Sequence, residues 1–326
     1  MSAEIILTRY PGERIDPAAD FALVDAPAPA PGEGEVLVRV THLSMDPFPR
    51  MRMRADSRVG PPMALGRAVE GRGIGTVIES RHPAFRAGEH VAGETGWREL
   101  AVLPGDQLSG LEATGAPPER HLSVLGPSGL TAYFVAHVLG RPQPGQTVVI
   151  APAAGSVGVL AGQIAKRSGA RVIGIGSGSQ CTALKETLGF DEAVDHAAID
   201  PAALGSVDLF IDGVGGPTHD AVLAAMAPRG RVILLGFIAG YGEGPRPYGS
   251  MLPALMKRLQ VEGFLLADWR DRFGEAKTQL AEWLGSGAIR PVETIWEGLD
   301  KAPAAFAALF GDAAPGKQIV RLFKED

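Results

Sequence analysis

The sequence predicts an α/β protein in which a doubly wound parallel sheet is joined to a smaller β-barrel-like domain. One observation is that short apolar runs alternate with amphipathic segments from about Leu122 onward. Strands that alternate with helices in this way form parallel sheets. A second observation is that residues 1–120 consist of short β-like runs between proline and glycine turns. This pattern of short runs and turns is typical of a compact β domain.

The β-like runs of the first part include residues 35–40, 73–79 and 99–102. Turn signals separate such runs, among them Ala30-Pro31-Gly32 and Arg86-Ala87-Gly88. Short strands with frequent turns indicate a barrel-like arrangement.

In the second part, the apolar periodicity changes between the spacing of strands and that of helices. The segment at 156–167 has apolar side chains at Val157, Leu160, Ala161, Ile164 and Ala165, which form one face of a helix. The expected elements are helices at 129–139, 156–167, 179–188 and 218–226, and strands at 146–151, 171–175, 207–211 and 231–235.

Composition narrows the class of protein. A chain of 326 residues is long enough for two domains. Its formal net charge of -6 does not suggest a nucleic-acid-binding protein, because phosphates would require a basic surface. The single cysteine, Cys181, can form neither an internal disulfide nor a Cys-rich zinc site. Residues 1–14 contain no apolar signal core, so we expect a cytoplasmic protein.

The uncharged segment at 148–165 has about the length of a membrane span. It contains Pro152, Gly155 and Gly158, and its periodicity changes halfway. A strand, a glycine turn and a buried helix explain these features better than a bilayer does. We therefore expect no membrane partner.

The strand at 146–151 runs into Ala153-Ala154-Gly155-Ser156-Val157-Gly158 and then into a helix. This is the dinucleotide-binding pattern of Rossmann folds, with alanine in the position of the first glycine. Gly155 lets the backbone approach a pyrophosphate, Gly158 lets the helix pack on the strand, and the helix N-terminus offers N–H groups to the phosphates. A simple strand–helix turn is the alternative. Because strand, turn, helix and second strand have the expected spacing, we predict a bound dinucleotide.

The end of the strand at 171–175 bears on the choice of cofactor. NAD enzymes usually carry Asp or Glu ~20 residues after the glycine pattern, where the carboxylate holds the ribose hydroxyls. Residues 175–180 read Ile-Gly-Ser-Gly-Ser-Gln and contain no carboxylate, which favours NADPH. They contain no Lys or Arg for the 2′-phosphate either, so the expected preference is moderate.

Several further segments occur in a fixed order along nearly the whole chain. They are residues 44–48 (SMDPF), 77–83 (VIESRHP), 96–97 (GW), 125–134 (LGPSGLTAYF), the glycine turn with 162–166 (GQIAK), 188–191 (LGFD), 212–216 (DGVGG) and 316–320 (GKQIV). In this order they resemble the zinc-independent medium-chain dehydrogenases/reductases. That family includes prostaglandin reductases, plant 2-alkenal reductases and bacterial curcumin reductase. Each segment alone is weak evidence, whereas the ordered set is specific.

The resemblance implies a GroES-like catalytic domain formed by residues 1–120 with 290–326, and a Rossmann dinucleotide-binding domain at 121–289 inserted between them. It implies a homodimer that uses NADP(H) to reduce the C=C bond of a small α,β-unsaturated aldehyde or ketone, by hydride transfer to the β-carbon. By resemblance, the cofactor contacts fall on Thr131, Gly155, Ser156, Val157, Gly158, Ser177, Gln180, His196, Gly213, Leu235, Gly236, Phe237, Ile238, Tyr241, Phe264, Leu265, Leu266 and Ala314.

The chain departs from the family pattern at five positions. The family's basic residue for the 2′-phosphate falls at or next to Gln180, and its nearby tyrosine aligns with His196. Asparagines near the nicotinamide are replaced by Gly213 and Ala314, and the tyrosine of an Asp-Pro-Tyr motif is Phe48. A charge-assisted hydrogen bond contributes about 1.5–3 kcal/mol, so losing one would weaken NADPH binding about ten- to a hundred-fold. Hydroxyl groups in the same turn and a protonated His196 would offset part of that loss.

Two tyrosines are candidates for the chemistry. Hydride arrival at the β-carbon places negative charge on the substrate carbonyl oxygen, which a hydrogen-bond donor would stabilise. Tyr241 and Tyr248 follow the strand at 231–235 in a glycine- and proline-rich loop, and such loops bind ligands in parallel sheets. We predict that Tyr248 is the partner of the substrate carbonyl or a ribose hydroxyl and that Tyr241 lines the site. Exposed loop aromatics are the alternative, whereas Tyr133 is expected in the core.

No metal site is expected, because none of the seven histidines has the spacing of HExxH or a cysteine partner. Arg50 could attract an anionic substrate or be a solvated surface residue. Two other functions fit many of the same motifs: a quinone reductase of the same superfamily, and a non-catalytic NADPH-binding protein. The segments at 44–47 and 79–83 favour enone reduction. A zinc alcohol dehydrogenase is excluded by the single cysteine and the lack of a Gly-His-Glu motif.

Overall fold

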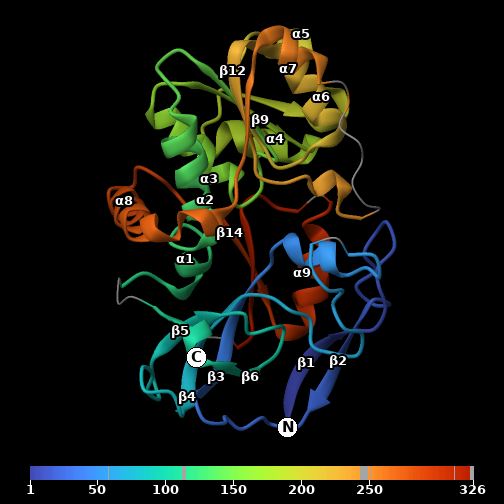
Figure 1. Ribbon diagram of the computed structural model, residues 1–326, viewed down its shortest axis with the longest axis vertical. Helices are drawn as coiled ribbons and strands as arrows, with labels where there is room; N and C mark the ends of the chain where they lie inside the picture. Colours follow the sequence, from blue (N-terminus) through green and yellow to red (C-terminus); the bar gives the residue numbers. More distant parts are fainter. Residues whose placement is uncertain (58, 112–114, 243–248, 250, 312, 324–326) are drawn as a thin grey trace. The chain divides into compact units, whose positions relative to one another are not determined.

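The computed structural model describes residues 1–57, 59–111, 115–242, 249, 251–311 and 313–323. Its internal contacts divide the chain into two units (Figure 1). The first unit comprises Met1–Leu122, Thr294–Ala313 and Lys317–Asp326, and the second comprises Ser123–Glu293 and Ala314–Gly316. Each unit contains its own main sheet.

The first unit is built on a seven-stranded sheet with the order β14-β15-β3-β4-β5-β7, in which β6 also pairs with β3. A two-stranded antiparallel sheet of β1 and β2 accompanies it. Its core includes Trp97, whose ring centroid lies 5.6 Å from that of Phe21 and 5.4 Å from that of Phe306. The elements are β1 Ser2–Leu7, β2 Phe21–Ala26, β3 Glu35–Ser44, β4 Gly73–Ser80, β5 His90–Gly93, β6 Leu100–Pro104, β7 Ser109–Gly110, α1 Pro118–Leu122, β14 Glu293–Glu297, α9 Ala302–Ala308 and β15 Lys317–Arg321.

Two segments that carry the family resemblance lie side by side in this unit. Lys317, almost fully buried, donates to Met45 O at 2.9 Å and to the carboxylate of Asp46, which also accepts a hydrogen bond from Ser44 Oγ. Burial alone would raise the pKa of Asp46, but the ion pair with Lys317 outweighs it and lowers that pKa. The buried ammonium therefore fixes the 44–48 segment to the start of β15.

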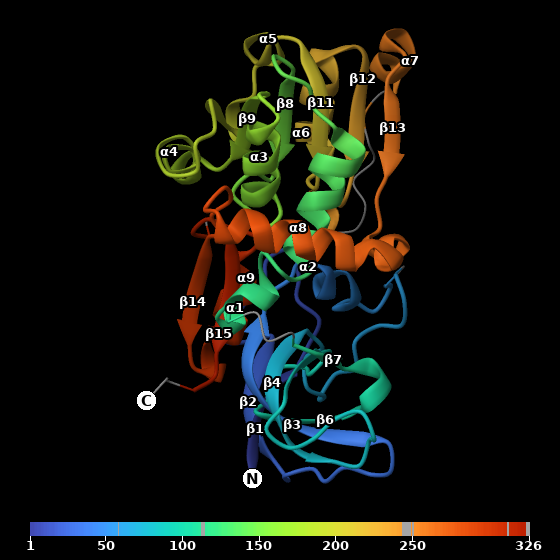
Figure 2. The ribbon, with the colours of Figure 1, turned by 90° about the vertical axis from the view of Figure 1, so that its left-hand side faces the viewer.

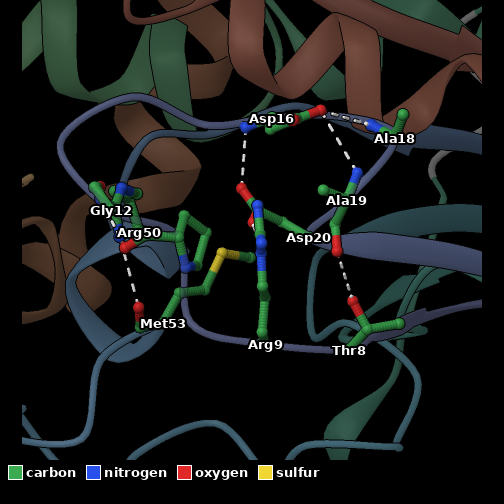
Figure 3. A network of polar contacts seen from close by, with 10 residues as sticks. Thr8, Arg9, Gly12, Asp16, Ala18, Ala19, Asp20, Arg50 and Met53 are labelled. Carbon is green, nitrogen blue, oxygen red and sulfur yellow. Dashed lines mark hydrogen bonds and ion pairs between the residues drawn. The ribbon is translucent and has the colours of Figure 1, made fainter.

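Arg50 is a buried structural residue, so both interpretations offered from the sequence were wrong. Its guanidinium, 1% exposed, donates to the carbonyl oxygens of Pro11 and Met53, both at 3.3 Å, and of Gly12. Figure 3 shows it joining two loops that are distant in sequence. A sequence pattern could not show this, because the acceptors are backbone carbonyls and carry no residue signature.

A buried aspartate fixes the other end of the same N-terminal loop. Asp20 accepts from Arg9 Nε and from Asp16 N, both at 2.7 Å (Figure 3). Asp16 in turn accepts from the backbone N–H groups of Ala18 and Ala19. Residues 9–20 are thus held by local turns and by Arg50 together.

The second unit is a doubly wound sheet of six parallel strands in the order β10-β9-β8-β11-β12-β13. Figure 1 shows α3 on one face of this sheet and α6 on the other, and Figure 2 shows its strands side by side. The elements are α2 Pro127–Ala132, a π-helix η3 at Tyr133–Gly140, β8 Thr147–Ala151, α3 Gly158–Arg167, β9 Arg171–Gly176, α4 Gly178–Glu186, β10 Glu192–Asp195, α5 Pro201–Leu204, β11 Val207–Asp212, α6 Gly216–Ala225, β12 Met226–Leu234, α7 Leu252–Lys257, β13 Gln260–Gly263 and α8 Phe273–Gly285.

The fold class is confirmed, and every helix and strand expected in the second part is present. In the parallel sheet of the second unit, two strands had been missed. β10 (EAVD) and β13 (QVEG) are short, polar edge strands, and edge strands need no continuous apolar run. The expected helix at 129–139 is α-helical only at its start and continues as the π-helix η3.

Among the residues that the structure describes, no helix is both long and apolar enough to cross a membrane.

Candidate cofactor-binding site

The carboxyl ends of β8 and β11 form the point where the winding of the parallel sheet reverses. From β8 the chain proceeds through β9 to β10 on one side, and from β11 through β12 to β13 on the other. Just beyond these strands, Gly213 N donates to Ala151 O at 2.6 Å. Because doubly wound sheets bind ligands at such a switch point, the loops that leave β8 and β11 are the natural start of a site.

The turn after β8 fits a dinucleotide pyrophosphate at Gly155. A Cβ on Gly155 would meet only Pro152, at 3.5 and 3.6 Å, which is ordinary van der Waals contact. The fold itself therefore does not require glycine at this position. Gly155, Ser156 and Val157 are all partly exposed. Helix α3 begins at Gly158, and the first N–H groups of a helix have no partner within it, so they suit phosphate oxygens.

Gly158 has a different role. A Cβ on Gly158 would lie 2.2 Å from Pro152 O and 2.6 Å from Ala153 O. Both contacts are with backbone, which cannot move aside as a flexible side chain can. Glycine is therefore required here for α3 to pack on the turn that precedes it.

A short segment near the C-terminus lies against the same turn. Gly316 N donates to Ala154 O at 2.8 Å, and Gly316 forms a parallel bridge with Gly155. Ala314, two residues earlier, is exposed. The predicted contact Ala314 thus lies two residues before Gly316, which is hydrogen-bonded to the glycine turn.

Asp212 holds the loop after β11 in place. Its Oδ1 accepts from the N–H groups of Val214 at 2.9 Å and Gly215 at 3.0 Å, and its Oδ2 accepts from His219 Nδ1 at 2.7 Å. Both side chains of the Asp212–His219 pair are buried. Asp212 had been noted only as the first residue of the 212–216 segment, and neither residue had been predicted to belong to the site.

Backbone hydrogen bonds join the loop after β12 to the loop after β11. Leu235 N donates to Asp212 O at 2.8 Å, and Ile238 N donates to Gly213 O at 3.0 Å. The predicted contacts at 235–238 and Gly213 therefore lie together. A Cβ on Gly213 would lie 3.2 Å from side-chain atoms of both Leu235 and Pro152, so the asparagine found there in the family would need small shifts of both neighbours.

Tyr241 folds back over its own loop. A Cβ on Gly236 would lie 3.3 Å from the Tyr241 hydroxyl, and the Tyr241 ring packs edge-on against Phe237 with 5.7 Å between centroids. Burial raises the pKa of Tyr241, although a hydrogen bond with the Phe237 backbone opposes the shift. A tyrosine phenol is protonated at neutral pH even at its ordinary pKa, so Tyr241 can act as a hydrogen-bond donor. Tyr248 lies outside the described residues.

The remaining predicted contacts on this side come from the segment that follows β13 and from α2. Phe264 is buried, donates its N–H to Leu234 O at 2.9 Å and stacks on Trp269 at 6.3 Å. Leu265 is exposed, and Leu266 begins a 3-10 helix. Thr131 is partly exposed on α2, which contacts α3.

A second group of predicted residues lies where β9 and β10 end. Ser177 and Gln180 form a capping box at the start of α4, in which Gln180 Oε1 accepts from Ser177 N at 3.0 Å. The Ser-x-x-Gln spacing signals such a box, but the sequence analysis had assigned Gln180 only to the cofactor. His196 Nδ1 donates to Gly176 O at 3.0 Å. The neighbouring Asp195 had been missed, because β10 itself had not been recognised as a strand.

Within the described part of the chain, no three His, Cys, Asp or Glu side chains converge as a metal site.

Comparisons with known proteins agree with this architecture. Residues 3–111 match a family described as the N-terminal domain of oxidoreductase, and residues 156–283 match one described as zinc-binding dehydrogenase. The NADPH-dependent curcumin reductase of Escherichia coli is 35% identical over 89% of this chain and 88% of its own. The NADP-dependent 2-alkenal reductase of Nicotiana tabacum is 33% identical over 89% and 88%. The solved structure of CurA from Vibrio vulnificus in complex with NADPH is 35% identical, with a TM-score of 0.91 over 99% of this chain and 100% of that one.

A doubly wound sheet inserted between the parts of a β-sheet unit, with these matches over nearly its full length, defines a medium-chain dehydrogenase/reductase. The chain belongs to the zinc-independent branch of that family, together with the curcumin, 2-alkenal and prostaglandin reductases.

The two glycines of the turn give a paired prediction. Gly155→Ala is expected to keep the melting temperature close to that of the unchanged protein, because its Cβ has space, and to weaken NADPH binding about tenfold by crowding the pyrophosphate. Gly158→Ala is expected to lower the free energy of unfolding by about 1–3 kcal/mol, because its Cβ would overlap backbone atoms. Thermal unfolding and calorimetric titration with NADPH measure the two effects. Unchanged NADPH affinity in Gly155→Ala would contradict the placement of the pyrophosphate.

Proposed function

We propose that this protein reduces the C=C bond of α,β-unsaturated aldehydes or ketones with NADPH. The observation that carries the proposal is the Gly155 turn, which leaves space at the switch point of a sheet closely similar to that of an NADPH-bound relative. Relatives named curcumin reductase and 2-alkenal reductase support the substrate class. A small enone or enal is the proposed substrate.

In this proposal the second unit holds the cofactor. The turn at 155–158 takes the pyrophosphate, while Gly213, Ala314 and the loops at 235–241 and 264–266 surround the nicotinamide half, with Thr131 contributing from α2. Ser177, Gln180 and His196 face the adenosine half. When bound, the reduced nicotinamide supplies the hydride that reaches the β-carbon of the substrate. The first unit, with its segments before and after the second, is proposed to be the GroES-like domain of the family.

The chain's own contribution to the chemistry is a hydrogen-bond donor for the substrate oxygen. As the β-carbon receives hydride, negative charge develops on the carbonyl oxygen, and a positioned O–H lowers the barrier by stabilising it. We assign this role to Tyr248. Tyr241, whose pKa is raised by burial, lines the site next to the Gly236 backbone. The α-carbon then takes a proton to give the saturated product.

We further propose that the protein is a homodimer that pairs through β13. This strand is the edge of the parallel sheet, and all four of its residues are exposed. Val261 within the strand is an exposed apolar residue, and further large apolar side chains flank the strand in exposed positions: Leu252, Leu255, Met256 and Leu265. An edge strand with apolar neighbours is a template for pairing with another strand. A second copy supplies an identical edge, which a two-fold axis can pair with the first.

The first prediction from the proposed function concerns the reaction itself. The purified protein is expected to oxidise NADPH with 2-alkenals or chalcone-like enones, and mass spectrometry should show the saturated aldehyde or ketone. Parallel assays with quinones and with NADH define the acceptor and cofactor ranges. Oxidation with quinones alone, or NADPH binding without oxidation of any acceptor, would contradict the proposal.

The second prediction concerns the tyrosines. Tyr248→Phe is expected to lower kcat about a hundred-fold, because it removes the donor to the developing oxyanion. Tyr133→Phe is the matched control, since the Tyr133 ring is buried in the second unit and its hydroxyl donates to the exposed Glu275 at 2.9 Å. Steady-state rates with one enal compare the variants. A kcat for Tyr248→Phe equal to that of the control variant would remove Tyr248 from the reaction.

The third prediction concerns the oligomer. Light scattering after gel filtration is expected to give the mass of a dimer, and Val261→Lys is expected to shift it towards the monomer, because charged side chains on an edge strand disfavour pairing. Leu23→Lys is the control, because Leu23 is an exposed leucine on β2 in the other unit. A Val261→Lys variant that remains dimeric would show that the copies associate elsewhere.

A further inference from the structure

Asp195 is a carboxylate at the place where dinucleotide-binding sheets select their cofactor. It is the last residue of β10, and the parallel register pairs it with Gly176, the last residue of β9. Both strands end at the same edge of the sheet. In NAD-binding sheets, an acidic residue near the end of the second strand holds the ribose hydroxyls. Here that second strand is β9, and its neighbour β10 supplies the acid.

The end of β9 offers no competing charge of its own. Residues 176–180 are Gly, Ser, Gly, Ser and Gln. The Gln180 carbonyl oxygen is engaged with Ser177 N in the capping box, and the hydroxyl oxygens of Ser177 and Ser179 lie 3.1 Å apart. These groups can hydrogen-bond either a ribose hydroxyl or a phosphate, so they do not decide between NADH and NADPH.

The Asp195 carboxylate is directed over the first turn of α4. Its Oδ1 accepts from Ala197 N at 2.9 Å. Its Oδ2 would lie only 2.8 Å from a Cβ on Gly178, the first residue of α4. The side chain is 40% exposed, so a ligand can reach it. Gly178 thus leaves the space that the carboxylate occupies beside the capping box.

Few positive charges oppose this carboxylate. Between Ser177 and His196 the basic residues are Lys185 and His196, and Lys185 lies in the last turn of α4, at the other end of the helix. His196 Nδ1 lies 3.5 Å from Asp195 Oδ1 and donates to Gly176 O.

We infer that Asp195 is a specificity-determining residue, which accepts a hydrogen bond from the adenosine ribose of NADH and repels the 2′-phosphate of NADPH. The inference rests on the proposed function and adds to it. This reductase uses NADH as well as NADPH, with a smaller preference for NADPH than the names of its relatives would suggest. Repulsion between the Asp195 carboxylate and the 2′-phosphate is expected to weaken NADPH binding about tenfold.

The test compares Asp195→Asn with the unchanged protein. The ratio of kcat/KM with NADPH to that with NADH is expected to rise about tenfold in the variant, through a lower KM for NADPH. Calorimetric titration gives a readout that does not depend on turnover. Adenosine 2′,5′-bisphosphate should bind about tenfold more tightly to Asp195→Asn, whereas 5′-AMP should bind equally or more weakly.

Glu192→Gln is the matched control. Glu192 is the first residue of β10 and pairs with Arg171 at 2.5 Å, so the change removes one negative charge from the same strand but at its other end. The inference is overturned if Asp195→Asn leaves the cofactor ratio unchanged, or if Glu192→Gln raises it equally. An unchanged protein that binds and oxidises neither cofactor would instead refute the proposed function, which makes the two failures distinguishable.

Discussion

The pairing of β8 with β11 is the constraint on which the candidate site depends. Because the chain winds outward from this pair in both directions, the turn into α3 and the turn into α6 begin at neighbouring positions on one edge of the sheet. The hydrogen bond from Gly213 N to Ala151 O fixes the two turns to each other. The loop after β12 then follows through its bonds to Asp212 O and Gly213 O. The proposed contacts at 155–158, at Gly213 and at 235–238 are therefore all positioned by this one junction.

Buried charged groups hold the loops of both units in the same manner. Asp212 satisfies its carboxylate with two backbone N–H groups and His219, Lys317 satisfies its ammonium with Met45 O and Asp46, and Arg50 uses three backbone carbonyls. A buried charge is costly unless it is fully hydrogen-bonded. Because each charge has partners that come only from one loop conformation, the cost of any other conformation is high. Glycine- and proline-rich loops thereby acquire defined shapes.

Much of this architecture could be predicted from the sequence, because it follows from periodicity. The alternation of apolar strands and amphipathic helices predicted the parallel sheet, and the spacing around Gly155 predicted the glycine turn between β8 and α3. What escaped prediction depends on groups without a local signature. Arg50 was assigned to substrate or solvent because its carbonyl acceptors are invisible in sequence, and β10 was missed because a four-residue polar edge strand has no apolar run. The capping role of Gln180 had a visible signal, Ser-x-x-Gln, that was not used.

The choice of cofactor shows why a distance along the chain is an incomplete guide. The rule that an acid follows the glycine pattern by ~20 residues assumes that the carboxylate stands on the second strand of the fold. The ribose, however, responds to the charge at a position in space, and parallel strands that end at one edge offer that position from either neighbour. In this chain the second strand, β9, ends in small polar residues, while Asp195 of β10 lies in register with its last residue. The lack of a carboxylate at 175–180 therefore describes only the end of β9, whereas the charge beside the ribose also depends on the end of β10.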